Sequence, residues 1–273
     1  MKLRPSVAFA VYAVLIVISF TTLLPFAWMV LMSFKPESEL TAASPVPHVW
    51  HYANYGEVGK AAPYFGRYYL NSLFVACWVT FLTVITSSMA AFAFARLRWK
   101  GRNVVFTMYL ATMMIPGVVT IIPNFAIMVK LQMLDTYSGL IVPVSFSAFG
   151  TFLIRQFMLG IPRALDEASV IDGANTWQVF IDVILPLARP GLITLAIFTF
   201  LGNYGSLFWP LIMIKSDGMR TLPVGLIQFD SVYNKATHLM MAASVMSIVP
   251  PMLLFIVGQK YLVKGIQLGA VKG

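Results

Sequence analysis

Residues 5–34 read PSVAFAVYAVLIVISFTTLLPFAWMVLMSF, a run of 30 residues without a charged side chain. A helix needs about 20 apolar residues to cross the hydrocarbon core of a bilayer. Strands of a membrane barrel would be about 9–11 residues long with alternating polarity, which is absent here. The run also exceeds the apolar part of a signal peptide, which is about 7–15 residues long. It therefore predicts a retained membrane-spanning helix.

The rest of the chain repeats this pattern. Five more uncharged runs follow, at residues 68–95, 103–129, 136–154, 190–214 and 236–259. Only 11% of the 273 residues are charged, against about 25% in soluble domains. This composition argues against a soluble enzyme, and the single cysteine, Cys77, excludes an internal disulfide framework. We expect an all-α membrane protein with six transmembrane helices, the fourth extending beyond Arg155 toward Met158.

The basic residues are distributed unevenly between the two sides of the membrane. Six crossings place both termini on one side, and that side receives 12 of the 19 Lys and Arg residues, four of them in the turn RLRWKGR at 96–102. The positive-inside rule then predicts cytoplasmic termini, with the inverted topology as the alternative. The net charge of +9 is explained by this topology, and no nucleic-acid partner is expected. The outside segment 36–67 is rich in Pro, Tyr and His and is expected to be folded or to lie along the membrane surface, in preference to a flexible linker.

Several of the predicted helices are expected to be broken by proline, at Pro116, Pro123, Pro210, Pro250 and Pro251. Proline removes an N–H donor and kinks a helix, which suits a bundle that lines a changeable cavity. The alternative is that membrane helices contain more proline than soluble ones for no special purpose. No acidic or basic residue lies in the interior of a predicted span. The chain therefore lacks the relay that ion-coupled transporters use, and its energy must come from elsewhere.

Motifs for catalysis and cofactor binding are missing. Residues 56–61 (GEVGKA) lack the spacing and the hydroxyl of a phosphate-binding loop. His48 and His51 have no further ligands at metal-site spacing, and no GxSxG elbow occurs. We expect no enzymatic activity, no metal and no cofactor in this chain.

The connection after the fourth span contains the strongest indication of function in the sequence. About 35 residues separate Arg155 from Pro190, whereas the other inside connections are short. Pro162 can begin a helix, with Asp166 and Glu167 in its first turns, where carboxylates favour the positive end of the helix dipole. Gly173 can adopt the left-handed conformation that ends a helix. These residues predict the first half of a helical hairpin.

A second helix follows the glycine. Asn175 or Thr176 can cap it, and Pro186 is expected to end it. Its predicted apolar stripe consists of Trp177, Phe180, Ile181 and Ile184. The hairpin either lies on the membrane surface as an amphipathic element or docks a cytoplasmic partner. Carboxylates and small residues suit a complementary socket better than an anionic lipid surface.

Residues 167–174 (EASVIDGA), followed by Phe180, Ile184, Leu185 and Pro186, resemble the EAA motif of ABC importer permeases. The one departure is Ser169 in place of the second alanine. Other stretches resemble the carbohydrate-uptake, maltose-permease-like branch of that family, so that the resemblance covers nearly the whole chain. They are residues 33–36 (SFKP), 71–72 (NS), 94–97 (FARL) and 269–273 (GAVKG).

The resemblance implies a type I importer with two permease subunits, two cytoplasmic ATPase subunits and an external solute-binding protein.

 The second permease subunit is expected to be a distinct chain. In that family the EAA hairpin is the coupling helix, which sits in a cleft of the ATPase and turns the cavity outward when the ATPase pair closes. ATP and Mg²⁺ would be bound by the ATPase and not by this chain.

Carried over to this sequence, the motif implies a coupling role for nine residues. Glu167 is the acidic anchor, Gly173 is the turn, and small residues provide close contacts. The full set is Glu167, Ala168, Ser169, Asp172, Gly173, Ala174, Phe180, Leu185 and Pro186. The implied division of the chain is an N-terminal helix with external segment (1–67), a five-helix permease core (68–262) with its coupling loop (159–190), and a cytoplasmic tail (263–273).

The fifth span departs from the family. Many relatives have W-N-x-F-x-W-P where this chain has YGSLFWP at residues 204–210. The candidate pathway residues are Asn124, Asn203, Tyr204 and Ser206. Interhelical hydrogen bonding and packing are the alternative roles for these side chains.

The expected function is transport of a sugar, oligosaccharide or polyol across the inner membrane of a bacterium or archaeon. One alternative keeps the importer fold with another solute, such as a glycerol phosphate, a peptide or an amino acid. The other is a channel or scaffold that works without an ATPase.

Overall fold

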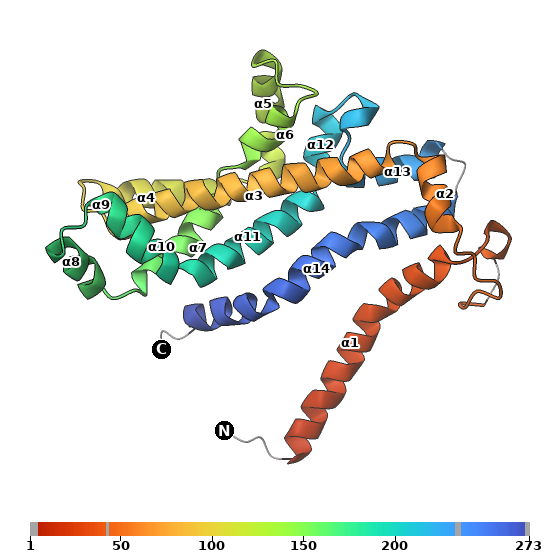
Figure 1. The fold of residues 1–273 in the computed structure, drawn as a ribbon, viewed down its shortest axis with the longest axis horizontal. Coiled ribbons are helices and arrows are strands. Elements are labelled where there is room, and N and C mark those ends of the chain that lie inside the picture. Colours follow the sequence, from red (N-terminus) through yellow and green to blue (C-terminus); the bar gives the residue numbers. More distant parts are fainter. Residues whose placement is uncertain (1–4, 42–43, 233–235, 271–273) are drawn as a thin grey trace. The chain divides into compact units, whose positions relative to one another are not determined.

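The computed structural model describes the backbone of residues 5–41, 44–232 and 236–270, which contains helices and loops and no strand (Figure 1). Its contacts divide the chain into two compact units. The smaller unit comprises residues 1–66 and 224–249, and the larger unit comprises residues 67–223 and 250–273.

The smaller unit contains α1 (Pro5–Ser33), η1 (Glu37–Glu39), α2 (Asn54–Ala61), most of α13 (Leu222–Val232) and the first part of α14 (Thr237–Ala270). Many apolar side chains of α1 are exposed, as expected of a helix surrounded by lipid. The segment after α1 is folded onto its end. The Asn54 side-chain amide donates to the carbonyls of Ser33 and Lys35, at 2.8 and 2.9 Å. The prediction that segment 36–67 is folded is confirmed for its described residues, 36–41 and 44–67.

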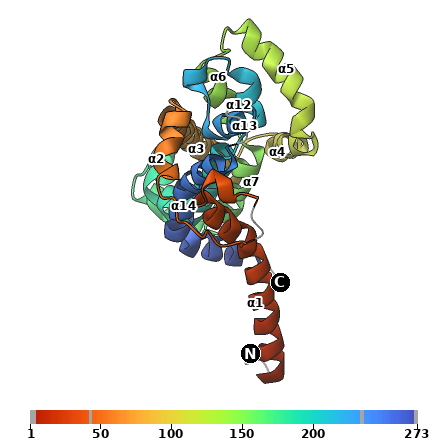
Figure 2. The same ribbon diagram turned by 90° about the vertical axis from the view of Figure 1, so that its right-hand side faces the viewer.

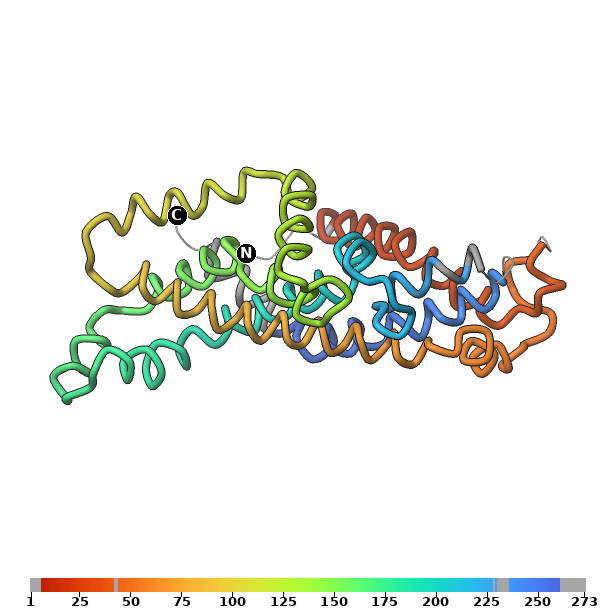
Figure 3. Tube along the Cα trace, turned by 90° about the horizontal axis from the view of Figure 1, so that it is seen from above, coloured from red at the N-terminus to blue at the C-terminus, as the bar shows by residue number. Residues whose placement is uncertain are grey.

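The larger unit is arranged along α3 (Phe65–Ala95). The helices that follow α3 are α4 (Arg102–Ala111), η2 (Thr112–Met114), α5 (Gly117–Lys130), α6 (Tyr137–Ile141), η3 (Val142–Val144), α7 (Ala148–Leu159), α8 (Ala164–Ile171), α9 (Thr176–Gln178), η4 (Val179–Ile184), α10 (Leu185–Leu187), α11 (Arg189–Tyr204), α12 (Phe208–Met213) and η5 (Asp217–Met219). Figure 3 traces this order along the chain. One buried cluster, which includes Phe92, Ile154 and Ile184, joins α3, α7 and the segment before α11.

Three helices are long and apolar enough to span a membrane by themselves, at Ser6–Ser33, Phe65–Ala95 and Thr237–Lys260. Three bent helix pairs are also long and apolar enough if each pair counts as one span. The described residues therefore offer up to six spans. The pairs are Arg102–Met114 with Gly117–Lys130 (99°), Tyr137–Val144 with Ala148–Leu159 (48°) and Thr176–Leu187 with Arg189–Tyr204 (74°). The first bend is visible in Figure 2 between α4 and α5. The all-α membrane fold is thus confirmed, as is the extension of the fourth span beyond Arg155 toward Met158, since α7 ends at Leu159.

The positions of the breaks differ in part from the prediction. Pro116 lies at the bend before α5, as expected, but Pro123 lies within the continuous helix α5. Pro250 and Pro251 likewise lie inside α14, which is not interrupted. The prediction that these three prolines break their helices is wrong, because neighbouring groups can compensate for a missing N–H in a packed membrane helix.

The break in the fifth run lies before its proline. α11 ends at Tyr204 and α12 begins at Phe208, so that Pro210 falls in the first turn of α12. The N–H groups of a first turn have no partner within the helix, and proline is tolerated there. The fourth run is also broken, where Ser147 accepts a hydrogen bond from the Gly150 N–H and begins α7 anew. The α14 helix continues to Ala270, and residues 271–273 of the predicted tail lie outside the described part of the chain.

Candidate functional site

A helix–turn–helix between α7 and α11 forms the candidate site, and we call residues 164–187 the hairpin. Its first helix, α8, ends in a glycine turn at Gly173, whose φ is +89°. The N–H of Gly173 donates to the Val170 carbonyl at 3.0 Å, and that of Ala174 donates to the Ser169 carbonyl at 2.9 Å. These two bonds form a Schellman motif, which ends α8 as the glycine predicted.

The second helix of the hairpin begins at a capping box. The Asn175 side chain accepts from the Gln178 N–H at 2.9 Å, and the Gln178 side chain accepts from the Asn175 N–H at 2.8 Å. Of the two caps that the sequence allowed, Asn175 is the one used. Two N–H groups at this helix start, those of Asn175 and Gln178, are thereby satisfied.

The end of the second helix differs from the prediction. Pro186 does not end it, because the helical path continues through α10 to Leu187 and bends by 74° before α11. Residues 179–184 form a wider π-helical turn directly before this proline. Pro186 lies in the first turn of α10, where a missing N–H costs little.

The π turn also changes which residues are buried. Phe180 and Ile184 of the predicted apolar stripe are buried, whereas Trp177 and Ile181 are exposed. The Phe180 ring lies 4.9 Å from the Phe92 ring of α3, measured between centroids. Phe180 therefore fixes the base of the hairpin to α3. The stripe prediction assumed regular α-helical spacing throughout, which the π turn interrupts.

The tip of the hairpin is uncovered. Glu167, Ala168 and Asp172 are exposed, and Ile171 is 85% exposed. Ser169 and Ala174 are half-buried, while Leu185 is half-buried and Pro186 exposed at the other end of the hairpin. An acidic and apolar surface of this kind, carried on a rigid turn, is suited to contact with another protein.

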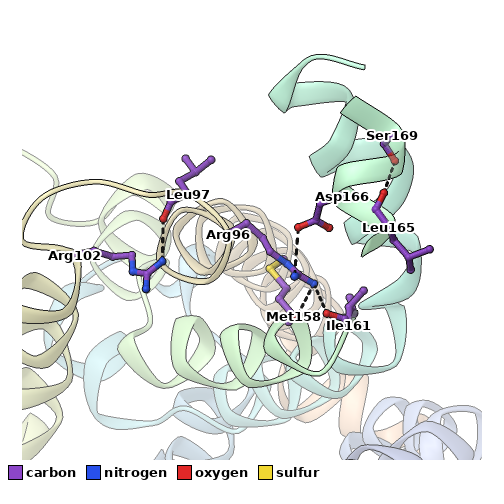
Figure 4. A network of polar contacts seen from close by, with 8 residues as sticks. All are labelled: Arg96, Leu97, Arg102, Met158, Ile161, Leu165, Asp166 and Ser169. Atoms are coloured by element: carbon purple, nitrogen blue, oxygen red, sulfur yellow. Dashed lines mark hydrogen bonds and ion pairs between the residues drawn. The ribbon is translucent and has the colours of Figure 1, made fainter. Parts of the chain in front are cut away.

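A buried arginine holds the hairpin in place (Figure 4). Arg96 directly follows α3, and its Nη2 donates to the carbonyls of Met158 and Ile161 at 2.7 and 2.8 Å. Its Nη1 lies 3.3 Å from Oδ2 of Asp166 in α8. The Arg96 side chain is 4% exposed and that of Asp166 is 21% exposed. We call these four contacting groups the Arg96 anchor; one side chain joins α3, the end of α7 and α8.

Arg96 remains positively charged although it is buried. Burial lowers the pKa of Arg96, Asp166 opposes this by raising it, and the like charge of Arg163 adds to the lowering. A guanidinium nevertheless stays protonated in proteins, so the ion pair persists at physiological pH. Sequence reasoning missed this pair: Arg96 counted only toward topology and family resemblance, and Asp166 only toward the helix dipole. The available signal was a basic residue placed directly after an apolar span.

Three of the candidate pathway residues lie at the break between α11 and α12, and the fourth, Asn124, lies on α5. Asn203 donates to the Thr199 carbonyl of its own helix at 2.8 Å. Tyr204 is buried, stacks on Phe200 and is hydrogen-bonded to Tyr69 of α3. These contacts fit packing as well as pathway lining.

The other two pathway candidates make fewer contacts. Ser206 lies half-buried in the break itself. Asn124 is half-buried on α5, and no side-chain hydrogen bond joins it to any described residue. The structure thus brings residues 203–206 together and leaves Asn124 without a bond to them.

The opposite end of α3 carries a polar connection that the sequence did not reveal. The Asn71 side chain donates to the carbonyls of Gly218 and Arg220, at 3.0 and 2.9 Å, and accepts from the Tyr137 hydroxyl at 2.7 Å. Ser72 Oγ accepts from the N–H of Leu222 at 2.7 Å, so the motif residues 71–72 tie α3 to the segment between α12 and α13. Within the part of the chain that the structure describes, no group of three or more His, Cys, Asp or Glu side chains could hold a metal ion.

Comparison with known proteins places this arrangement among transport proteins. The model of the family described as binding-protein-dependent transport system inner membrane component matches residues 83–268. The chain is 34% identical over 260 residues to the arabinooligosaccharides transport system permease protein AraQ of Halalkalibacterium halodurans, covering 94% of this chain and 93% of that protein. It is 32% identical over 223 residues to the sn-glycerol-3-phosphate transport system permease protein UgpE of Yersinia pestis, covering 81% of this chain and 78% of that protein.

A solved structure is similar over the whole length. It is the crystal structure of a bacterial ABC transporter involved in the import of the acidic polysaccharide alginate. The match has a TM-score of 0.85 at 25% sequence identity and covers 96% of this chain and 99% of that chain.

Proposed function

Because this chain belongs to the family of binding-protein-dependent transport system inner membrane components, we propose that it is a membrane-spanning subunit of an ATP-driven sugar importer. Its partners would be two ATPase subunits, a second permease chain and an external solute-binding protein. The observation that carries the proposal is the uncovered hairpin tip held rigidly to α3 by the Arg96 anchor. ATP hydrolysis would take place on the ATPase, where ATP and Mg²⁺ are bound.

The coupling step follows from the hairpin's surface. Glu167 is exposed and would pair with a basic residue of the ATPase, while Ala168, Ser169 and Ala174 allow close approach. Asp172 and Gly173 lie at the turn. Closure of the ATPase pair would move the hairpin as a rigid body, because Phe180 and Arg96 fix it to α3. The displacement would therefore reach the spans and change the access of the cavity.

The proposed cargo is a sugar, an oligosaccharide or a polyol. AraQ is named for arabinooligosaccharides and the structural relative for alginate, both of them carbohydrates. We propose that Asn124, Asn203, Tyr204 and Ser206 line the pathway, where amides, hydroxyls and an aromatic ring suit a hydroxylated solute. A glycerol phosphate is the second candidate, since UgpE is named for it. A phosphorylated solute favours a cationic site, however, and residues 68–95 and 190–214 contain no Lys or Arg.

We propose the domain division 1–67, 68–262 and 263–273, with both termini in the cytoplasm. The hairpin then lies on the cytoplasmic side. Asp172→Cys, introduced into a Cys77→Ala background, is expected to react only with thiol reagents that enter the cytoplasm. Asp172 is exposed on the turn, so its accessibility does not depend on unfolding. Labelling of this cysteine in intact cells by an impermeant reagent would show that the hairpin lies outside and that the inverted topology is correct.

The experiment that tests the function is purification of the tagged chain from native membranes in a mild detergent, with mass spectrometry of all stoichiometric partners. We expect an ATPase, a second permease and a solute-binding protein. The binding protein can then be assayed directly for carbohydrates and for glycerol phosphate. Recovery of the chain alone, under conditions that preserve a known importer, would favour a channel or scaffold instead.

A further inference from the structure

A basic cavity lies at the turn between α3 and α4, beside the hairpin. Its volume is about 570 Å³, and its walls include Arg98, Arg102 and Arg163 together with Trp99 and Asn103. All of these residues belong to the larger unit. Arg163 directly precedes α8, so the cavity adjoins the base of the hairpin.

The three arginines have no acidic partner among the described residues. Arg102 donates to the Leu97 carbonyl at 3.0 Å and to the Asn103 side chain at 3.4 Å, both of them neutral acceptors. Of the two acidic residues of the nearby helix α8, Asp166 is engaged by Arg96, and Glu167 forms no ion pair with any of the three arginines. The cavity therefore gathers three positive charges, which attract an anion.

The cavity lies at the level where two spans end. The Trp99 indole N–H donates to the Ala93 carbonyl at 3.3 Å, which folds the ring back onto the end of α3. Gly101, with a φ of +81°, reverses the chain into α4. Tryptophan at the end of a span is typical of the membrane–water interface, where lipid headgroups lie.

The walls are also mixed in polarity. Trp99 is 40% exposed and Val104 is 58% exposed, and both line the same cavity as the arginines. A free phosphate would use the guanidinium groups only, whereas a phospholipid would place its phosphate there and its glycerol backbone against the apolar side chains. Basic pockets between membrane helices on the cytoplasmic side bind anionic headgroups in this way.

We propose that this cavity binds the phosphate of an anionic phospholipid in the cytoplasmic leaflet. The inference rests on the topology in the proposed function. The bound phosphate neutralises Arg163, whose like charge repels that of Arg96. The lipid thereby strengthens the Arg96 anchor and stabilises the hairpin.

The test uses the purified importer, with the subunits that accompany the chain, in nanodiscs of phosphatidylglycerol or phosphatidylcholine. Native mass spectrometry measures retained lipid. We expect preferential retention of phosphatidylglycerol, and Arg98→Gln with Arg163→Gln is expected to reduce it about tenfold. Both side chains are exposed, so the fold should persist. The control is Lys100→Gln, compared with Arg98→Gln alone: each removes one charge from the same turn, but Lys100 does not line the cavity.

Each arm of the experiment has a defined meaning. Equal retention of the two lipids, or equal loss in the Lys100→Gln control, overturns the proposal. Inorganic phosphate that competes with phosphatidylglycerol supports a phosphate site, and phosphate binding without lipid selectivity overturns its assignment to lipid. Copurification of the ATPase is scored separately, so failure of the lipid site is distinguishable from failure of the proposed function.

Discussion

Replacing Arg96 by methionine is expected to lower the free energy of unfolding by about 3 kcal/mol, because Asp166 then remains as a largely buried carboxylate without its cation. The carbonyls of Met158 and Ile161 lose their donor as well. The measurement is denaturation of the purified chain in detergent, with unfolding monitored by tryptophan fluorescence. The hairpin should also become more accessible to protease.

A double-mutant cycle separates the ion pair from the carbonyl bonds. Adding Asp166→Asn to Arg96→Met should recover part of the loss, because it removes the unpaired charge. The control is Lys100→Met, an exposed lysine four positions away that lies outside the basic cavity and has no ion pair within the described residues, and its effect should be within about 0.5 kcal/mol. An Arg96→Met effect no larger than that of the control would show that the anchor does not hold the hairpin.

The second large effect concerns Glu167. Glu167→Lys is expected to reduce solute uptake to the level of cells that lack the chain, since it reverses the charge proposed to pair with the ATPase. The side chain is exposed and joins no ion pair among the described residues, so membrane insertion and stability should not change. Uptake of radiolabelled solute and ATPase activity of the purified complex measure the result.

The matched control is Asp182→Lys, which makes the same charge reversal at an exposed position of the second helix outside the acidic motif turn. It is expected to retain most of the uptake. Full uptake by the Glu167→Lys protein would contradict the coupling role. The two predictions differ in kind, because the Arg96 variant loses stability and the Glu167 variant keeps it.

Local patterns were sufficient for much of the fold. Uncharged runs located the spans, since each charged residue in the hydrocarbon core raises the free energy of insertion. Gly173 and Asn175 marked the turn and the second helix start of the hairpin, because a left-handed backbone and an N-cap each depend on a few adjacent residues. The acidic motif around Glu167 indicated the candidate site by family resemblance.

Other features lie beyond local patterns. Pro123, Pro250 and Pro251 did not break their helices, because the consequence of a missing N–H depends on the groups packed around it. The π turn at 179–184 moved the buried face of the hairpin, which an assumption of regular helical spacing could not foresee.

The sequence by itself therefore determined the membrane class, the approximate spans and the hairpin with its turn and cap. Only the tertiary structure decided how the hairpin is attached. Arg96 contacts groups 62 and 65 positions away in the sequence, at Met158 and Ile161, as well as Asp166. No periodicity or spacing encodes such contacts, because they exist only after α3, α7 and α8 have packed and excluded water from the arginine.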